Sequence, residues 1–501
     1  MPPCRAFKSK FPVRKSLPPV FLTLSLLFIY LASIAPGLTW ANDGADGGDL
    51  ISAAATAGIA HPSGYPTYLL LARLFQLLPI GSLAFRTNLM SALAGVLASL
   101  LVYGLLVWVS DSPAHDHWLA GLIAGFSFGL APMLWSQAVI TEVYTLHTAL
   151  CALVMLLTLW KPGGQSRPWS ENLSGLALGL AIGNQLTAVF LIAPVLLISA
   201  WRGKWKFNVR SLLRVCAGLC AGLLVYSALP LRALSNPPVN WGNPSTLEQF
   251  KWLVSGELYQ SRLLNLPPAG VLERCQALAT LLLHQFELPG IVLGLVGLIY
   301  YFKPSRLYFF TILNVISFSL FAILYASFDS YIYLLPAFLS FGLWIGLGAD
   351  GLLQSISKYQ RQARIGLMLL ISIWFLAAGF TRWPEVDAAH DTRAEQFGAH
   401  AMQSLPQNAI VFVDSDRAIF GLWYFQYALK QRPDITVIAT ELLGWDWYIH
   451  TLRSTYPALD WSAKITWSPS IIQNNPGHPI CQVSYWNKEE ISCNSGINTS
   501  P

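Results

Sequence analysis

Three aspartates and a histidine stand close together near the N-terminus, directly after the first long apolar segment. The aspartates are Asp43, Asp46 and Asp49, spaced by glycine and alanine, and His61 opens the run His-Pro-Ser-Gly-Tyr-Pro. A carboxylate inside a bilayer is costly, so a cluster of them beside a membrane span indicates a function. Neighbouring carboxylates raise one another's pKa, and a raised pKa suits a general base. The cluster therefore predicts acid–base chemistry at a membrane surface.

A structural role is the alternative for these residues. Glycines permit a tight turn, and Asp49 could cap a helix that starts near Leu50. Capping needs one aspartate, whereas the segment holds three, which favours a function for the cluster. His61 could bind a phosphate or hydrogen-bond a backbone carbonyl, and Pro66 can open the next helix.

Other polar side chains stand at the ends of apolar runs. Glu142 begins one such run and could be a site residue or the ionic partner of Arg232. Arg232 precedes a proline-containing turn with Trp241, and it could hold a phosphate or, like Trp241, anchor the chain at the interface. Arg73 could contact a phosphate in bidentate fashion or extend towards lipid headgroups.

Membrane spans are the elements that must position these residues. Of the 501 residues, 54% are hydrophobic and only 11% are charged, whereas soluble domains average about 25% charged residues. A span needs about 20 apolar residues. About eleven apolar runs are candidates, two of them short: 17–38, 87–109, 118–134, 138–160, 171–184, 186–200, 211–230, 287–302, 307–327, 332–350 and 363–382.

The distribution of charge predicts orientation and domains. Because basic loops stay in the cytoplasm, the tail 1–16 should be cytoplasmic, and later Lys/Arg clusters follow after even numbers of spans. The transmembrane domain 17–382 would then carry two outer loops, 39–86 and 231–286. Residues 383–501 hold 12 acidic against 7 basic residues. Within them, 409–414 and 434–439 read as strands and 417–430 and roughly 445–456 as helices, which predicts a small extracytoplasmic α/β domain.

The first apolar run and the cysteines bear on the compartment. The run could be a cleaved signal peptide, but no clear cleavage site follows it, and its length favours a retained anchor. No set of cysteines has zinc-site spacing. Cys481 and Cys493 lie together in the polar C-terminal part, and in an oxidising compartment they could form a disulfide, a pairing that the sequence leaves open.

Nearly all the unusual polar residues fall on the outer side of the predicted topology. A transporter would place polar groups near the bilayer midplane, so this one-sided distribution favours an enzyme at the outer leaflet. The sequence shows no basic face on a soluble fold, which argues against nucleic-acid binding. It contains no P-loop, serine-hydrolase elbow, zincin motif or Rossmann fingerprint, which argues against ATP-driven pumps, serine hydrolases and zinc proteases.

Five motifs, taken in chain order, resemble one family of GT-C membrane glycosyltransferases. They are Asp46-Gly-Gly-Asp49-Leu, His61-Pro-Ser-Gly-Tyr-Pro, Asn88-Leu-Met-Ser-Ala-Leu, Glu142-Val-Tyr, and Leu229-Pro-Leu-Arg232 with Trp241-Gly-Asn-Pro244. The animal member of this family is a transmembrane protein O-mannosyltransferase of the endoplasmic reticulum. The similarity covers about residues 20–340, and the Arg432-Pro-Asp region is similar as well.

The resemblance implies an α-helical GT-C fold whose first outer loop carries the catalytic Asp46, with Asp49 as the second acid. It also implies a polyprenyl-phosphate sugar donor and a transfer that usually inverts the anomeric centre. Substrate binding would involve a set of polar and aromatic residues: His61, Tyr65, Arg73, Glu142, Asn184, Gln185, Arg232 and Trp241.

This sequence departs from the family pattern at three positions. Asp49 stands where glutamate is usual, Ser63 where proline is common, and Gln185 where a histidine often follows Asn184. The shorter side chain of Asp49 could change the geometry around an acceptor or a metal. The departures therefore bear on the substrate more than on the fold.

The sequence thus predicts a glycosyltransferase of a bacterial-type inner membrane. It would move a mannose-like sugar from a polyprenyl-phosphate donor to a protein or lipid hydroxyl at the outer face, where no nucleotide site is needed. The alternative is a multi-span lipid or polyol transporter with an outer accessory domain. Mg²⁺ or Mn²⁺ could assist through the paired aspartates, although no complete ligand set is visible.

Overall fold

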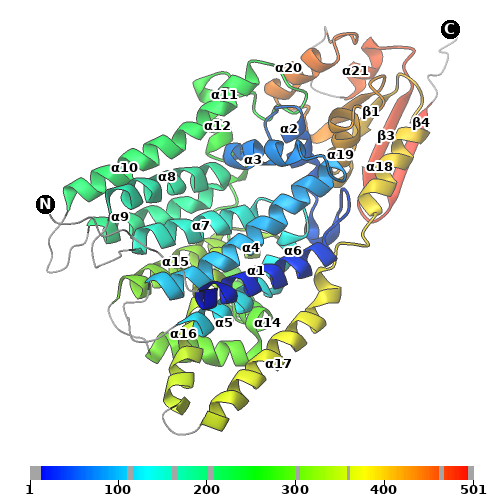
Figure 1. Ribbon diagram of the computed structural model, residues 1–501. Helices are drawn as coiled ribbons and strands as arrows, with labels where there is room; N and C mark the ends of the chain where they lie inside the picture. Colours follow the sequence, from blue (N-terminus) through cyan, green and yellow to red (C-terminus); the bar gives the residue numbers. More distant parts are fainter. Residues whose placement is uncertain are drawn as a thin grey trace, which may run out of the picture.

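A bundle of helices, with a small sheet domain at one end, forms the structure (Figure 1). It is a computed structural model that describes residues 13–109, 117–160, 167–200, 208–300, 305–357, 361–461 and 468–494. Residues 1–12 of the predicted cytoplasmic tail, and many of the basic residues that predicted orientation, lie outside the described residues.

Thirteen labelled α-helices of the described residues build the bundle. They are α1 (Val13–Ser33), α4 (Leu83–Val109), α5 (Trp118–Gly129), α6 (Pro132–Ala138), α7 (Tyr144–Leu159), α8 (Pro168–Asn184), α9 (Ile192–Ala200), α10 (Val209–Leu223), α11 (Ala228–Ala233), α14 (Pro268–Tyr300), α15 (Arg306–Leu324), α16 (Leu335–Ser357) and α17 (Arg361–Val386). Short 3₁₀ turns connect some of them: η3 (Leu186–Leu191), η4 (Leu224–Ser227) and η5 (Ser330–Leu334).

The multi-span helical protein that the sequence predicts is confirmed. Within the described residues, six helical stretches are long and apolar enough to cross a membrane, and a seventh is counted if α5 and α6, bent by 68°, form one span. The prediction of about eleven spans counted every apolar run as a span. Further runs form shorter apolar helices, among them Leu17–Ser33, Tyr144–Leu159 and Leu186–Ala200, and the total of about eleven stays a prediction.

Close approach of helices α8 and α10 depends on glycine. Gly175 and Gly179 on α8 face Gly218 and Gly222 on α10, and a Cβ atom at any of the four would overlap backbone atoms of the other helix. Small residues four apart allow helix backbones to approach closely where lipid supplies no hydrophobic driving force. This seam fixes α8, which ends at the cavity described below.

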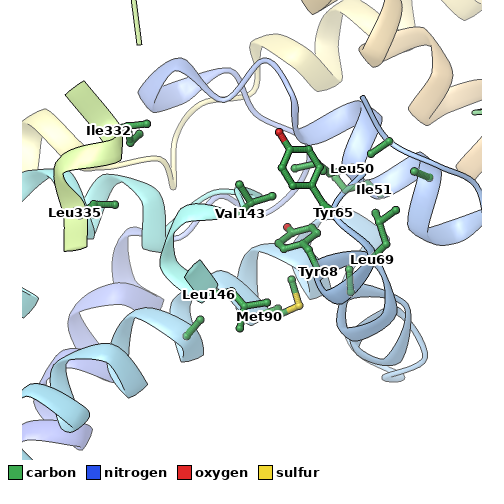
Figure 2. Close-up of a cluster of buried hydrophobic side chains, with 14 of the residues drawn as sticks. Leu50, Ile51, Tyr65, Tyr68, Leu69, Met90, Val143, Leu146, Ile332 and Leu335 are labelled. Atoms are coloured by element: carbon green, nitrogen blue, oxygen red, sulfur yellow. The ribbon is translucent and has the colours of Figure 1, made fainter. Parts of the chain in front are cut away.

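The segment predicted as the first outer loop contains three short helical elements. They are η1 (Ala41–Asp43), α2 (Gly47–Ala55) and α3 (Pro66–Gln76). Pro66 opens α3, as predicted, because its fixed φ angle and missing N–H suit a first helical position. Figure 2 shows Tyr65 and Tyr68 among apolar side chains of α2, α4 and the start of α7. The loop is therefore folded onto the bundle.

The structure contradicts the capping alternative for Asp49. The residue at the N-cap of α2 is Asp46, whose side chain makes no capping hydrogen bond, and Asp49 lies inside the helix. Both carboxylates are thus free of a capping task.

The segment predicted as the long outer loop is partly helical. It contains α12 (Leu247–Val254) and α13 (Glu257–Gln260), and α14 already begins at Pro268. Helix α14 changes direction at Glu287, where φ is 52° and Pro289 follows. A proline cannot donate the helical hydrogen bond, which explains a break at this position.

The C-terminal part forms a four-stranded mixed sheet with helices around it. The strand order is β2-β1-β3-β4, in which β1 pairs in parallel with β2 and β3, and β4 is antiparallel to β3. Its elements are α18 (Arg393–Ser404), β1 (Ile410–Val413), α19 (Asp416–Trp423), η6 (Tyr424–Ala428), β2 (Thr436–Ala439), η7 (Thr440–Leu442), α20 (Asp446–Thr455), α21 (Ser468–Asn474), β3 (Ile480–Tyr485) and β4 (Glu489–Asn494).

The predicted strands near 409–414 and 434–439 correspond to β1 and β2, whereas β3 and β4 were not predicted. Cys481 and Cys493, the predicted disulfide candidates, are paired across β3 and β4 and joined by a disulfide.

Candidate active site

Asp49 is the buried centre of the first outer loop. Its carboxylate Oδ2 accepts a hydrogen bond from the His61 backbone N–H at 3.1 Å and lies 2.8 Å from His61 Nδ1. The other oxygen, Oδ1, accepts from Trp241 Nε1 at 3.0 Å. The side chain has no exposed surface, so these partners are what make the buried charge tolerable. Asp49 therefore holds His61 and Trp241 and does not itself reach the cavity.

Asp46 is the member of the predicted pair that faces open space. Its side chain is 41% exposed, and its Oδ2 lies 3.6 Å from His61 Nε2. The Tyr65 hydroxyl lies 3.1 Å from the same ring nitrogen and donates to the Pro62 carbonyl. His61 thus bridges a buried carboxylate and a cavity-facing one. The two predicted catalytic acids occupy different positions, one in the cavity and one behind the histidine.

The charged groups of this network shift one another's pKa. Burial raises the pKa of Asp46, nearby Asp49 adds to this rise, and His61 opposes it. Burial would lower the pKa of His61, but Asp46 and Asp49 outweigh it and raise the pKa to about 9. The imidazole is then protonated at neutral pH, so both ring nitrogens carry a hydrogen: Nδ1 donates to Asp49, and Nε2 donates to the Tyr65 hydroxyl with Asp46 3.6 Å away.

A cavity of about 900 Å³ contains Asp46. Its lining includes apolar side chains of η3 and α15, among them Leu186, Val189 and Phe321. The lining also includes polar and charged side chains, among them Arg262. A second cavity of about 280 Å³ lies against the carboxyl ends of β1 and β2. The residues that line both cavities include Asp46, His61, Tyr259, Arg262, Asp414, Asp416 and Glu441.

Two predicted residues join Asp46 and His61 in the first cavity, and one lines the second. Tyr65 and Gln185 line the larger cavity, each with a nearly buried side chain. Trp241 lines the smaller one.

Besides Asp49, four predicted residues line neither cavity. Arg232 donates to the Gly58 carbonyl at 3.0 Å, and Asn184 donates to the Val143 carbonyl at 3.1 Å. Glu142 is buried and accepts from the Val143 backbone, while Arg73 is exposed in the last turn of α3. Arg232 and Glu142 therefore share neither cavity with Asp46.

Arg262 is a cavity residue that sequence reasoning missed. It lines both cavities, donates to Ser327 Oγ at 3.2 Å and lies 5.4 Å from the ring centre of Tyr259. No motif marks it, because it follows α13 in the long loop and reaches Asp46 only through the folding of distant segments. Asp416 was missed as well, since it opens α19 in the C-terminal part.

The carboxylates of the site do not form a metal cage. Among the described residues, no group of three or more His, Cys, Asp or Glu side chains is arranged to hold a metal ion.

Two family models match the chain. One, described as the Protein O-mannosyl-transferase TMEM260 N-terminal domain, matches residues 46–208 and so includes Asp46, His61 and Gln185. The other, described as TMEM260-associated domain 2, matches residues 394–473 in the C-terminal part.

Curated relatives match along most of the chain. The protein O-mannosyl-transferase TMEM260 of Mus musculus is 27% identical over 85% of this chain and 63% of the mouse protein. The corresponding protein of Dictyostelium discoideum is 25% identical over 96% of this chain and 62% of its own length. The chain thus spans about three-fifths of the length of these relatives.

Solved structures share the fold at low sequence identity. ArnT from Cupriavidus metallidurans, crystallised with undecaprenyl phosphate, superposes with a TM-score of 0.60 at 13% identity, covering 93% of this chain and 92% of ArnT. The oligosaccharyltransferase of Archaeoglobus fulgidus gives a TM-score of 0.54 at 13% identity, covering 83% of this chain and 64% of that enzyme. Together these matches confirm the predicted GT-C-like fold and the family resemblance: residues 46–208 and 394–473 are similar to the two TMEM260 domains, and most of the chain is similar to the TMEM260 relatives.

Proposed function

We propose that this protein transfers a mannose-like sugar from a polyprenyl-phosphate donor to a protein or lipid hydroxyl. The observation that carries the proposal is the larger cavity, whose lining combines apolar side chains with Asp46 and Arg262. A polyprenyl phosphate combines the same two kinds of chemistry, an apolar chain and a charged group. The names of the relatives and the ligand of ArnT support this reading.

Asp46 is the proposed general base. The acceptor hydroxyl would attack C1 of the sugar, its proton would pass to the Asp46 carboxylate, and the C1–O bond would break with the electron pair leaving on the phosphate. An attack opposite the leaving phosphate inverts the anomeric centre. Asp46 suits this role because part of its side chain is accessible from the cavity. Loss of hydration within the cavity raises the pKa of its carboxyl, which makes it a better base.

Arg262 is the proposed stabiliser of the leaving phosphate. A guanidinium can donate two parallel hydrogen bonds to phosphate oxygens, and a fixed cation lowers the energy of the charge that develops there. Arg262 takes over the role expected of Arg232, which is turned towards the Gly58 carbonyl. Tyr65 and Gln185 would contact the sugar or the phosphate from the cavity wall.

The acceptor is proposed to approach through the smaller cavity. This cavity opens beside Asp46 and is walled by the ends of β1 and β2, so the C-terminal part would select the acceptor. The proposal keeps the predicted division at residue 383, with about eleven spans. It also keeps the N-terminus cytoplasmic and the C-terminal domain outside a bacterial-type inner membrane. Cysteine labelling within 39–60 tests the orientation, because labelling only from the cytoplasm would contradict it.

Transfer of radiolabelled mannose from purified polyprenyl phosphate tests the function. We expect Asp46→Asn to lose activity by about 100-fold or more, since a general base contributes 10²–10⁴. We expect Arg262→Gln to lose more activity than Arg232→Gln. Asp446→Asn, an exposed aspartate in the first turn of α20, is the matched control. Full activity of Asp46→Asn would refute the proposed base, and no transfer by the unaltered protein would refute the donor.

A further inference from the structure

Helix α19 of the C-terminal part packs directly on the histidine of the first outer loop. The ring of His61 lies parallel to the ring of Phe420, with centres 6.5 Å apart and planes at 15°. The other rings near His61, those of Tyr65 and Trp241, meet it edge-on at 71° and 76°. Of these three rings, Phe420 is the one whose plane lies nearly parallel to that of the imidazole.

The same helix also contacts the second partner of Asp49. Trp241, which donates to Asp49, has its ring 6.3 Å from Phe420 and 6.3 Å from Trp423. One surface of α19 therefore touches both residues whose hydrogen bonds satisfy the buried carboxylate. Aromatic pairs at such separations add to the free energy of packing beyond the buried area.

Gly48 makes this contact possible. A Cβ atom at Gly48 would overlap the carbonyl oxygen of Phe420, so α2 and α19 meet backbone to backbone. At the neighbouring Gly47, a Cβ atom would lie 3.5 Å from Thr141 Cβ, an ordinary van der Waals distance. The close contact therefore requires glycine at position 48, whereas position 47 has room for a Cβ atom.

We propose that Phe420 is a positioning residue, which holds the imidazole of His61 between Asp49 and Asp46 from the C-terminal part of the chain. Loss of the ring would leave space beside a half-enclosed ion network, and water would enter it. Because exclusion of water strengthens the attraction between opposite charges, water that enters would weaken the attraction between the imidazolium and the two carboxylates. The consequence for activity rests on the proposed function, whereas the consequence for His61 does not.

Several ionisable groups face His61 and act on its protonation. They come from the turn before α2, from α2 itself, from the start of α3, from the turn before α7 and from α19: Asp46, Asp49, Tyr65, Glu142 and Asp416. Phe420 is uncharged, so its replacement changes this set only through geometry and hydration.

Carbethoxylation of His61, followed by mass spectrometry over a range of pH, tests the proposal without any sugar transfer. The reagent attacks the neutral imidazole, and His61 lines both cavities. We expect Phe420→Leu to lower the midpoint pH of the reaction by about one unit, which raises the rate at pH 7 about tenfold. Phe420→Tyr keeps the ring and should restore the profile. Phe425→Leu removes an equally buried ring elsewhere in the same part and should leave the profile unchanged.

Two outcomes would overturn the proposal. One is an unaltered His61 profile in Phe420→Leu, including equal resistance of His61 in both proteins. The other is an equal shift in Phe425→Leu, which would mean that general loosening of the C-terminal part is the cause.

The glycine pair supplies an independent comparison. Gly48→Ala should change the His61 profile in the same direction as Phe420→Leu, whereas Gly47→Ala should not. In transfer assays, we expect Phe420→Leu to lower kcat about tenfold, with little change in KM for the donor. If the unaltered protein shows no transfer, the proposed function fails, and the carbethoxylation result still decides the role of Phe420.

Discussion

Replacement of Asp49 by asparagine tests the buried network most directly. The three contacts of the carboxylate are to N–H groups: the His61 backbone, protonated His61 Nδ1 and Trp241 Nε1. Asparagine keeps one oxygen and turns the other into an NH₂ donor. At least one buried N–H would then face another donor. We therefore expect Asp49→Asn to destabilise the fold by about 3 kcal/mol at pH 6.5, from one lost charge-assisted bond and one unsatisfied donor.

The loss should depend on pH through His61. The pKa of His61 is raised to about 9 in the folded protein, against an ordinary value of about 6.5 in an unfolded chain. A raised pKa contributes stability that is fully present below about pH 6.5 and is lost as the pH rises through about 9, a contribution of about 3 kcal/mol. Asp49→Asn removes part of it. The difference in stability between the two proteins should therefore narrow by about 1 kcal/mol or more between pH 6.5 and pH 10.

Denaturation in mixed micelles at a series of pH values measures this difference. Asp446→Asn is the control, because its exposed carboxylate has no role in the network. Parallel pH profiles for the unaltered protein and Asp49→Asn would refute the reasoning, since His61 would then titrate independently of Asp49. A loss below about 1 kcal/mol at pH 6.5 would also count against the three buried hydrogen bonds.

Three further predictions follow from packing and chemistry. His61→Gln should lower kcat for transfer at least about tenfold and flatten its alkaline limb, because the imidazolium beside Asp46 is lost; an unchanged pH–rate profile would contradict it. Cys481→Ser should destabilise the C-terminal part by about 3 kcal/mol, measured as faster proteolysis, and reductant should have no added effect on this variant. Gly179→Leu should cost about 2 kcal/mol or more by overpacking the seam with α10, seen as a lower thermal midpoint. Gly366→Leu, where nothing lies within 4 Å, should not.

The features that short stretches of sequence determine were predictable: the polar cluster of the first outer loop and the apolar helices. The aspartates and His61 are twelve to eighteen residues apart in one loop, so the hydrogen bond between Asp49 and His61 is a contact within that loop. Apolar runs predicted the bundle for the same reason, since each helix carries its own apolar length. The number of spans was less predictable, because the bend between α5 and α6 has no unambiguous mark in the sequence.

Contacts between segments far apart in the chain could not be predicted from the sequence. Arg262 and Asp416 come to the cavity from the long loop and from the C-terminal part, and nothing near either residue marks its distant partners. The separate positions of Asp46 and Asp49 depend on helix α2, which turns one carboxylate out and the other in. Their spacing in the sequence gives no sign of which carboxylate faces the cavity and which is buried. Likewise, the sequence shows Gly48 only as a turn glycine, because its close contact with α19 joins segments far apart in the chain.

The disulfide between β3 and β4 links folding of the sheet to the chemistry of its surroundings. Strand β4 lies at the edge of the sheet and buries little of its surface, so its side chains alone hold it weakly. An edge strand that detaches would expose the backbone of β3 to pairing with other chains. Oxidation of the two thiols prevents this, and it occurs outside reducing compartments. A chain whose two thiols stay reduced would therefore be more prone to aggregate than the oxidised chain.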